Sequence, residues 1–222
     1  MATINNRILL KFKKSMRKHF PLLLPVLLKV ASRTVLFKAE RAYLLGNKRE
    51  SDSKLKSVVL LSQPRGGTQI CEQVISSIYQ KGGGETLNIG KFFFWYDNEQ
   101  VKNVCSEDWT TDNLETSGFF YGNFGAYDDV SKIPKLKYIV MCRDPRDVLL
   151  SHYFSVKDAH LINSKKSLGR SQDAQKLTVD EYVLMDENIS DVMRFMDQTI
   201  AMLSSDHDFL FIRYEDMMAE PQ

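Results

Sequence analysis

Residues 58–70 read VVLLSQPRGGTQI and decide the fold class of this 222-residue chain. The run begins with four apolar residues, a pattern typical of a strand that is buried on both faces of a parallel sheet. After the glycines, Ile70, Val74 and Ile78 recur at helical spacing. The order strand, glycine loop, helix therefore predicts an α/β domain with a central parallel β-sheet flanked by helices.

The loop between this strand and this helix has the features of an anion site. Gly66 and Gly67 allow the backbone to curl with its N–H groups pointing inward, where a Cβ would obstruct a ligand. The helix N-terminus adds unpaired N–H groups, Arg65 adds a guanidinium and Thr68 adds a hydroxyl. No Lys follows the second glycine, so this is not a Walker A loop. A structural turn without a ligand is the alternative interpretation.

Residues 137–154, KYIVMCRDPRDVLLSHYF, predict a second buried strand followed by a helix. Arg143 stands at the carboxyl end of this strand, where ligands of open α/β sheets gather. Ser151 lies about two turns into the helix. The two side chains could together hold a second phosphate. The alternative is an ion pair from Arg143 to Asp147 or Asp144.

Taken together, the segments PRGGT and RDPRDVLLS resemble the cofactor-binding signatures of the sulfotransferase family. Members of that family carry a P-[KR]-[SG]-G-T loop for the 5′ side of 3′-phosphoadenosine 5′-phosphosulfate (PAPS). They carry an R-[ND]-P-[KR]-D-x-x-x-S segment for its 3′-phosphate. Residues 208–216, DFLFIRYED, are similar to a later strand of the family that ends in YED. The resemblance runs from about residue 55 to residue 221.

The resemblance implies a P-loop-like sulfotransferase fold and a PAPS-dependent enzyme. The 5′-phosphosulfate would be held by Arg65, Gly66, Gly67, Thr68 and Gln69. The 3′-phosphate would be held by Arg143 and Ser151. Arg65 would also be catalytic, because it can stabilise charge during sulfuryl transfer, and no metal is required. The acceptor would be a hydroxyl or amine of a small molecule, a lipid or a glycan.

One departure from the family concerns the base that activates the acceptor. Many members supply a His between the two cofactor motifs, but no His lies between Arg65 and Arg143 here. Asn123 stands where that His is expected, and Asn cannot accept a proton at neutral pH. The carboxylates that remain open as substitutes are Asp128, Asp129 and Glu115.

Two further functions therefore stay open beside the enzyme. The first is a catalytically impaired sulfotransferase-like domain that binds a nucleotide, a membrane or a partner. The second is a nucleotide or small-molecule kinase, against which the missing Lys of the glycine loop argues. The family also continues past YED with helices and a basic, glycine-containing loop, whereas this chain ends at Gln222. The C-terminal part of the domain is therefore expected to be missing.

The charge is concentrated at the N-terminus. Residues 1–38 contain nine Lys or Arg and no acidic residue, whereas the rest of the chain has 21 basic and 28 acidic residues. This split predicts no nucleic-acid partner. We assign residues 1–54 to a basic N-terminal segment with a linker, and residues 55–222 to the sulfotransferase-like domain.

The N-terminal segment bears on location. Its apolar run, residues 20–28, is shorter than the roughly 20 residues of a membrane-spanning helix. A helix on the domain surface, a contact with an anionic membrane and a transit peptide all remain open. Three cysteines without a CxxC pair favour a reducing compartment and argue against zinc. The expected location is the cytoplasm, with membrane association as an alternative.

Two local patterns precede the YED segment. Residues 157–177 are polar and predict a mobile surface loop. Thr178 and Glu181 then form a capping-box pattern. Ile189, Met193 and Ile200 belong to an apolar stripe at helical spacing, which predicts a long helix.

Overall fold

A computed structural model describes residues 37–44, 51, 53–63, 65–90, 92, 114–124, 136–159 and 165–219. These residues fall into two compact units. The first contains Phe37–Leu149 and Asp186–Gln222, and the second contains Leu150–Met185. Most of the predicted basic N-terminal segment, residues 1–36, lies outside the described residues.

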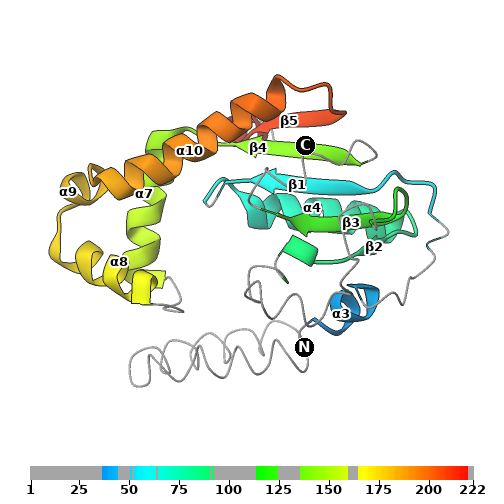
Figure 1. Ribbon diagram of the computed structural model, residues 1–222, viewed down its shortest axis with the longest axis horizontal. Helices are drawn as coiled ribbons and strands as arrows, with labels where there is room; N and C mark the ends of the chain where they lie inside the picture. The colour runs from blue at the N-terminus through cyan, green and yellow to red at the C-terminus, as the bar shows by residue number, and fades with distance from the viewer. Residues whose placement is uncertain are drawn as a thin grey trace. The chain divides into compact units, whose positions relative to one another are not determined.

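The first unit is built on a five-stranded parallel sheet (Figure 1). Its strand order is β2-β3-β1-β4-β5. The strands are β1 (Val58–Ser62), β2 (Glu85–Thr86), β3 (Phe119–Asn123), β4 (Lys137–Cys142) and β5 (Phe209–Arg213). Each strand pairs in parallel with its neighbours, so all carboxyl ends lie at one edge. The predicted α/β fold with a central parallel sheet is confirmed.

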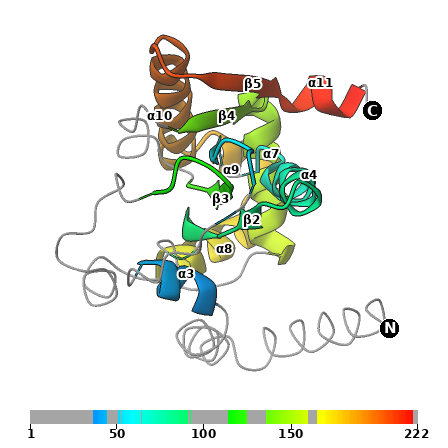
Figure 2. The same cartoon turned by 90° about the vertical axis from the view of Figure 1, so that its right-hand side faces the viewer.

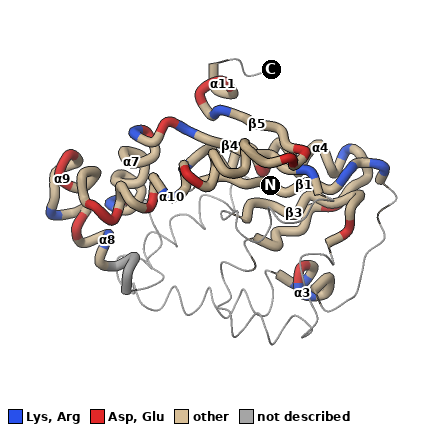
Figure 3. The backbone as a smooth tube through the Cα atoms, turned by 45° about the horizontal axis from the view of Figure 1, so that its top comes forward, with Lys and Arg blue, Asp and Glu red and all other residues tan. Residues whose placement is uncertain are grey.

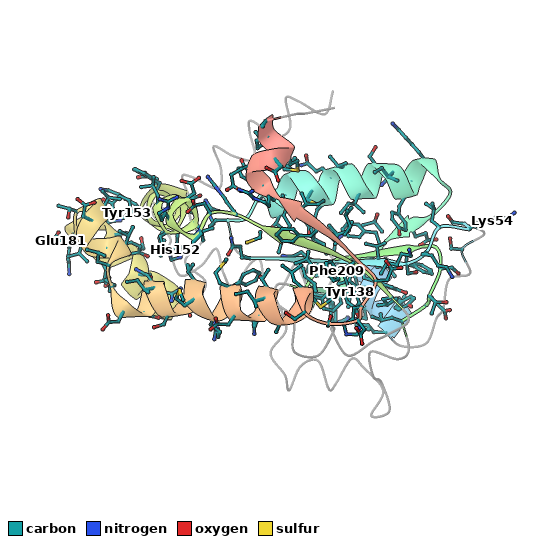
Figure 4. The ribbon with its side chains drawn as sticks, turned by 90° about the horizontal axis from the view of Figure 1, so that it is seen from above. Lys54, Tyr138, His152, Tyr153, Glu181 and Phe209 are labelled. Atoms are coloured by element: carbon teal, nitrogen blue, oxygen red, sulfur yellow. The ribbon has the colours of Figure 1, made fainter. Side chains whose placement is uncertain are left out.

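Helices cover both faces of this sheet. One face packs against α4 (Thr68–Lys81) through a core that includes Leu60, Met141 and Ile75. The opposite face packs against α10 (Asp186–Leu203) through a core that includes Val59, Val140 and Phe195. Figure 4 shows these two helices on opposite sides of the strands.

Two shorter helices complete the first unit. Helix α3 (Lys38–Leu44) places Tyr43 and Leu44 in the same core as α10. Helix α11 (Tyr214–Ala219) continues directly from β5 (Figure 2). It contributes Tyr214 and Met217 to the α4 side of the sheet.

Charged residues are kept out of the strand interiors (Figure 3). Strands β1 and β3 contain none, β4 begins with Lys137 and β5 ends with Arg213. Lys137 pairs with Asp208 just before β5, at 2.7 Å. This arrangement follows from the cost of burying an unpaired charge between packed layers.

The second unit is helical. It contains the C-terminal part of α7 (Pro145–Phe154), a π-helical turn (Ser155–Ala159), α8 (Lys165–Lys176) and α9 (Val179–Val183). Tyr153, Ala174 and Tyr182 belong to its buried cluster. The side chains of His152 and Tyr153, labelled in Figure 4, lie beside each other on α7.

The predicted capping box is present at α9. Thr178 Oγ1 accepts a hydrogen bond from the Glu181 N–H, and the Glu181 carboxylate accepts one from the Thr178 N–H. The predicted loop at residues 157–177 is wrong for Lys165–Lys176, which form α8. The reason is tertiary: Ala174 is fully buried and Leu177 packs against the aromatic cluster, so a few contacts fix an otherwise polar helix.

The predicted long helix is present as α10, although its buried face differs from the apolar stripe. Phe195, Thr199 and Met202 are buried, whereas Met193 and Ile200 are 52% and 59% exposed. Among the described residues, no helix is long and apolar enough to cross a membrane.

Candidate functional site

The glycine loop lies at the carboxyl edge of the sheet, where it joins β1 to α4 (Figure 1). Gly67 is the N-cap of α4 and has a left-handed backbone with φ 89°. No side chain caps this helix end. The N–H groups of Gly67, Thr68 and Gln69 have no acceptor among the described residues. The start of α4 therefore offers a set of backbone donors with partial positive charge.

Both predicted loop glycines are closely packed, and Gly67 leaves no space for a Cβ. A Cβ on Gly66 would lie 3.0 Å from Gln63 Cγ. A Cβ on Gly67 would lie 2.4 Å from Tyr214 Cδ2. Tyr214 is the first residue of α11, so the YED segment packs directly against the glycine loop. The sequence pattern alone does not indicate this contact.

The structure brings the two predicted arginines together. Arg143 Nη1 donates a hydrogen bond to the Arg65 carbonyl oxygen at 3.2 Å. Burial, and next the charge of Arg143, lower the pKa of Arg65. The Nε atoms of both side chains are buried and have no hydrogen-bond partner among the described residues. The two residues, with their interacting charges and unused donors, make this region a candidate anion site.

The ion pair considered as an alternative for Arg143 also exists. Arg143 Nη2 lies 3.7 Å from Asp147 Oδ2, and the Asp147 side chain is 52% exposed. At that distance and exposure the pair is weak. The guanidinium of Arg143 also lies over the ring of Tyr214, 4.5 Å from its centroid. The ion pair and a phosphate ligand are therefore compatible.

Arg65 itself has an unusual backbone. Its φ is 69°, the only positive φ of a non-glycine residue in the described part of the chain. Such strain of a bulky residue persists only where the surroundings impose it, and it concentrates at ligand sites. Thr68, three residues later, directs its hydroxyl to Ser62 Oγ at 2.9 Å. These contacts fix the loop before any ligand binds.

One residue missed by the sequence analysis connects the two arginine-bearing loops. Gln63 is 1% exposed and its Nε2 donates to the Arg143 carbonyl oxygen at 2.9 Å. Its own carbonyl oxygen accepts a hydrogen bond from the Gly66 N–H at 3.0 Å. The only sequence signal for this role was that Gln63, a residue with a long amide side chain, directly follows a buried strand.

Asn123, the residue at the expected histidine position, has a structural role: its side chain joins strand β3 to strand β1. Its Oδ1 accepts a hydrogen bond from the Ser62 N–H at 2.9 Å, and its Nδ2 donates to the Ser62 carbonyl oxygen at 3.4 Å. Its backbone N–H donates to Glu72 Oε1 at 3.3 Å. Glu72 is a buried carboxylate on α4 that the sequence analysis did not single out.

None of the three carboxylates considered as substitutes for the histidine is placed at the glycine loop by the described part of the structure. Asp128 and Asp129 lie outside the described residues. Glu115 precedes β3, at the amino edge of the sheet, whereas Arg65 follows the carboxyl end of β1. The structure therefore does not bring Glu115 to the glycine loop.

The start of α7 is held in place by two carboxylates. Glu215 Oε1 accepts a hydrogen bond from the Asp144 N–H at 2.8 Å. Asp144 accepts from the Arg146 N–H and pairs with its guanidinium at 2.6 Å. The hydrogen bonds from Arg146 lower the pKa of Asp144 to about 2. These contacts give Glu215 and Asp144 architectural roles.

A pocket of about 210 Å³ lies beside Arg143. Its lining residues are Cys142, Arg143, Asp144, Pro145, Met196, Phe211, Arg213 and Glu215. Most small-molecule sites measure about 300–1,000 Å³. This pocket therefore has room for one part of a nucleotide.

Two predicted site residues make no hydrogen bond or ion pair with this cluster in the part of the chain that the structure describes. Gln69 is exposed on the first turn of α4. Ser151 is half-buried on α7 in the second unit, and its pairing with Arg143 stays a prediction. Within the described residues, no group of three or more His, Cys, Asp or Glu side chains is arranged to hold a metal ion.

The sheet, the glycine loop and the two arginines form an α/β domain with a candidate anion site at the carboxyl edge of its sheet. Comparison with known families refines this class, because residues 128–222 match the family described as "Sulfotransferase domain". The match includes Arg143, Ser151 and the YED segment. The match supports the predicted resemblance to the sulfotransferase family over these residues. Among curated proteins, none matches the chain.

Proposed function

We propose that the protein binds PAPS at the carboxyl edge of its sheet and acts as a PAPS-dependent sulfotransferase. The observation that carries the proposal is the contact between Arg65 and Arg143. The positive charge of Arg143 contributes to lowering the pKa of Arg65, and each side chain has a buried Nε that a bound anion could use. A nucleotide with a 5′-phosphosulfate and a 3′-phosphate carries charge at two points, as this pair requires.

The glycine loop fits the 5′ side of such a ligand. The unpaired N–H groups at the start of α4 and the Arg65 guanidinium would bind the oxygens of the phosphosulfate. When bound, PAPS would supply a sulfuryl group: the acceptor oxygen or nitrogen bonds to sulfur while the bond from sulfur to the 5′-phosphate oxygen breaks. Arg65 would stabilise the negative charge that grows on that oxygen, so no metal is required.

A hydroxyl or amine acceptor loses a proton when it bonds to sulfur, so a base must take up that proton. Asn123 cannot take it, because an amide is not a base at neutral pH, and both ends of its amide bond to Ser62. An amine acceptor needs less help than a hydroxyl. The acceptor class, whether a small molecule, a lipid or a glycan, and the cytoplasmic location remain predictions from the sequence.

A catalytically impaired, nucleotide-binding domain is the second candidate. The observation that favours it is the structural use of Asn123, which leaves the expected position of the base without a proton acceptor. Both candidates require nucleotide binding, and they differ only in turnover. Binding and transfer must therefore be measured separately.

The test begins with calorimetric titration of the full chain with adenosine 3′,5′-bisphosphate. Arg65→Ala and Arg143→Ala should each weaken binding by about tenfold or more, since each removes a charge-assisted contact. Arg194→Ala is the matched control, because Arg194 is 72% exposed and pairs with Asp191 on α10. Unchanged affinity in both site variants would refute the proposal.

Transfer is then measured with ³⁵S-labelled PAPS and a panel of alcohols, phenols, amines and glycans. Labelled product that disappears in Arg65→Ala identifies an enzyme. Tight binding of the bisphosphate without labelled product for any acceptor favours the impaired domain. Stronger binding of ATP–Mg²⁺ than of PAPS would instead favour a kinase.

A further inference from the structure

We infer that Gln63 is a positioning residue that sets the preference of this site for a nucleotide bearing a 3′-phosphate. This inference rests on the proposed function. Gln63 stands between the two loops that carry the arginines, one residue after β1 ends. Its side-chain bond to Arg143 joins residues that are 80 positions apart in the sequence.

The backbone and the side chain of Gln63 act on different loops. The carbonyl oxygen accepts from the Gly66 N–H at 3.0 Å, which belongs to the glycine loop. The side-chain Nε2 donates to the Arg143 carbonyl oxygen at 2.9 Å, which belongs to the β4–α7 connection. A change of side chain therefore removes the hold on Arg143 and leaves the bond to Gly66 in place.

The length of the Gln63 side chain matters for the glycine loop. A Cβ at Gly66 would lie 3.0 Å from Gln63 Cγ, so the loop packs against the unbranched stem of this residue. A branched side chain would push against Gly66. Methionine keeps the unbranched stem and nearly the same volume but cannot donate a hydrogen bond.

The cost of this amide indicates a role beyond stability. Gln63 Oε1 is buried and has no hydrogen-bond partner among the described residues. A buried polar atom without a partner destabilises the folded state. An apolar residue of the same shape would avoid that cost, so the gain from this amide lies in fixing Arg143 relative to Arg65.

A weaker hold on Arg143 should affect the binding of the 3′-phosphate of the nucleotide and not its 5′ side. Arg143 is the residue proposed to bind the 3′-phosphate, whereas Arg65 and the α4 N-terminus are proposed to bind the 5′ side. Loosening Arg143 should therefore weaken adenosine 3′,5′-bisphosphate and leave 5′-AMP nearly unaffected. The informative quantity is the ratio of the two affinities.

The experiment compares wild type, Gln63→Met and Gln73→Met in the full chain, by calorimetric titration with adenosine 3′,5′-bisphosphate and 5′-AMP. Gln73 is an exposed glutamine on α4 and serves as the matched control. In Gln63→Met, the bisphosphate affinity should fall by about five- to tenfold, as for the loss of one buried hydrogen bond. The affinity for 5′-AMP should change by less than about twofold, within the scatter of surface substitutions.

Thermal unfolding is measured on the same samples. Because Gln63→Met removes a buried unpaired oxygen together with a hydrogen bond, its unfolding midpoint should stay within about 3 °C of wild type. An equal loss for both nucleotides, or an unchanged ratio of affinities, would overturn the inference while the proposed function stands. If wild type binds neither nucleotide, the proposed function fails and the inference fails with it.

Discussion

The ring of Tyr214 lies against Gly67, so closely that a Cβ at Gly67 would be 2.4 Å from Tyr214 Cδ2. Gly67 also needs its left-handed backbone, with φ 89°. The contact ties the end of β5 to the glycine loop that follows β1. The YED segment thus packs against the loop of the candidate anion site through Tyr214, although it carries no positive charge of its own.

Gly67→Ala should be strongly destabilising. Left-handed strain costs about 1 kcal/mol for a non-glycine residue, and the clash with Tyr214 should add about 1–3 kcal/mol. Gly83→Ala is the matched control, since Gly83 has φ +74° and a Cβ added there would meet no atom within 4 Å. Urea unfolding of both variants measures the difference. Equal losses of stability would show that the Tyr214 contact contributes nothing.

Asn123→Ala tests the structural use of this residue. The variant loses the two side-chain bonds to Ser62, whose backbone is fully buried. We expect a loss of about 2 kcal/mol in the free energy of unfolding, measured by urea denaturation. Asn123→Asp keeps the acceptor for the Ser62 N–H but places a second carboxylate near Glu72, so it should also destabilise. Wild-type stability in both variants would contradict the structural role.

Ser151→Ala tests the one site residue that lies in the second unit. If its hydroxyl binds the 3′-phosphate, the variant should bind adenosine 3′,5′-bisphosphate about tenfold more weakly and 5′-AMP normally. Ser190→Ala, an exposed serine on α10, is the control. Titration calorimetry gives both affinities. Unchanged bisphosphate binding would remove Ser151 from the site.

The Asp144–Arg146 pair predicts a pH dependence near the start of α7. The pKa of Asp144 is lowered from 3.8 to about 2, first through the hydrogen bonds from Arg146. Because the folded-state pKa lies below the ordinary value, the stabilising contribution is present above pH 4 and is lost as the pH falls from about 4 to about 2.

Arg146→Ala should move the Asp144 titration upward toward pH 3.8, as followed by ¹³C NMR of the carboxyl carbon. Arg194→Ala should leave that titration unchanged, because Arg194 pairs with Asp191 on another helix. An Asp144 titration that does not move in Arg146→Ala would show that another group holds the carboxylate ionised.

The features that could be predicted from the sequence are those encoded locally. The strands β1 and β4 are short apolar runs, and the loop and helix that follow each have glycine, proline and helical spacing as direct signals. Parallel strands bring their carboxyl ends to one edge, which is why Arg65 and Arg143 could be expected to meet. In the structure the two loops do meet, since Arg143 Nη1 donates to the Arg65 carbonyl oxygen at 3.2 Å.

Other features depend on contacts between residues far apart in the sequence, and no local sequence pattern predicts them. The bond from Gln63 to Arg143 depends on how β1 and β4 are aligned, Ser62 pairing with Met141. The hydrogen bonds between the Asn123 side chain and the Ser62 backbone depend on the irregular pairing of β1 with β3. Helix α8 was missed because Ala174 is small and gives little apolar signal, although it is completely buried.

The hydrogen bond from Arg143 to the Arg65 carbonyl oxygen, which brings two basic residues to one edge of the sheet, has a practical consequence for handling the protein. We expect inorganic phosphate or sulfate in a purification buffer to compete for the proposed anion site and to raise the melting temperature of the protein. Titrations performed in such buffers will report weakened apparent affinities. A zwitterionic buffer with chloride as the counter-ion is therefore the appropriate reference condition.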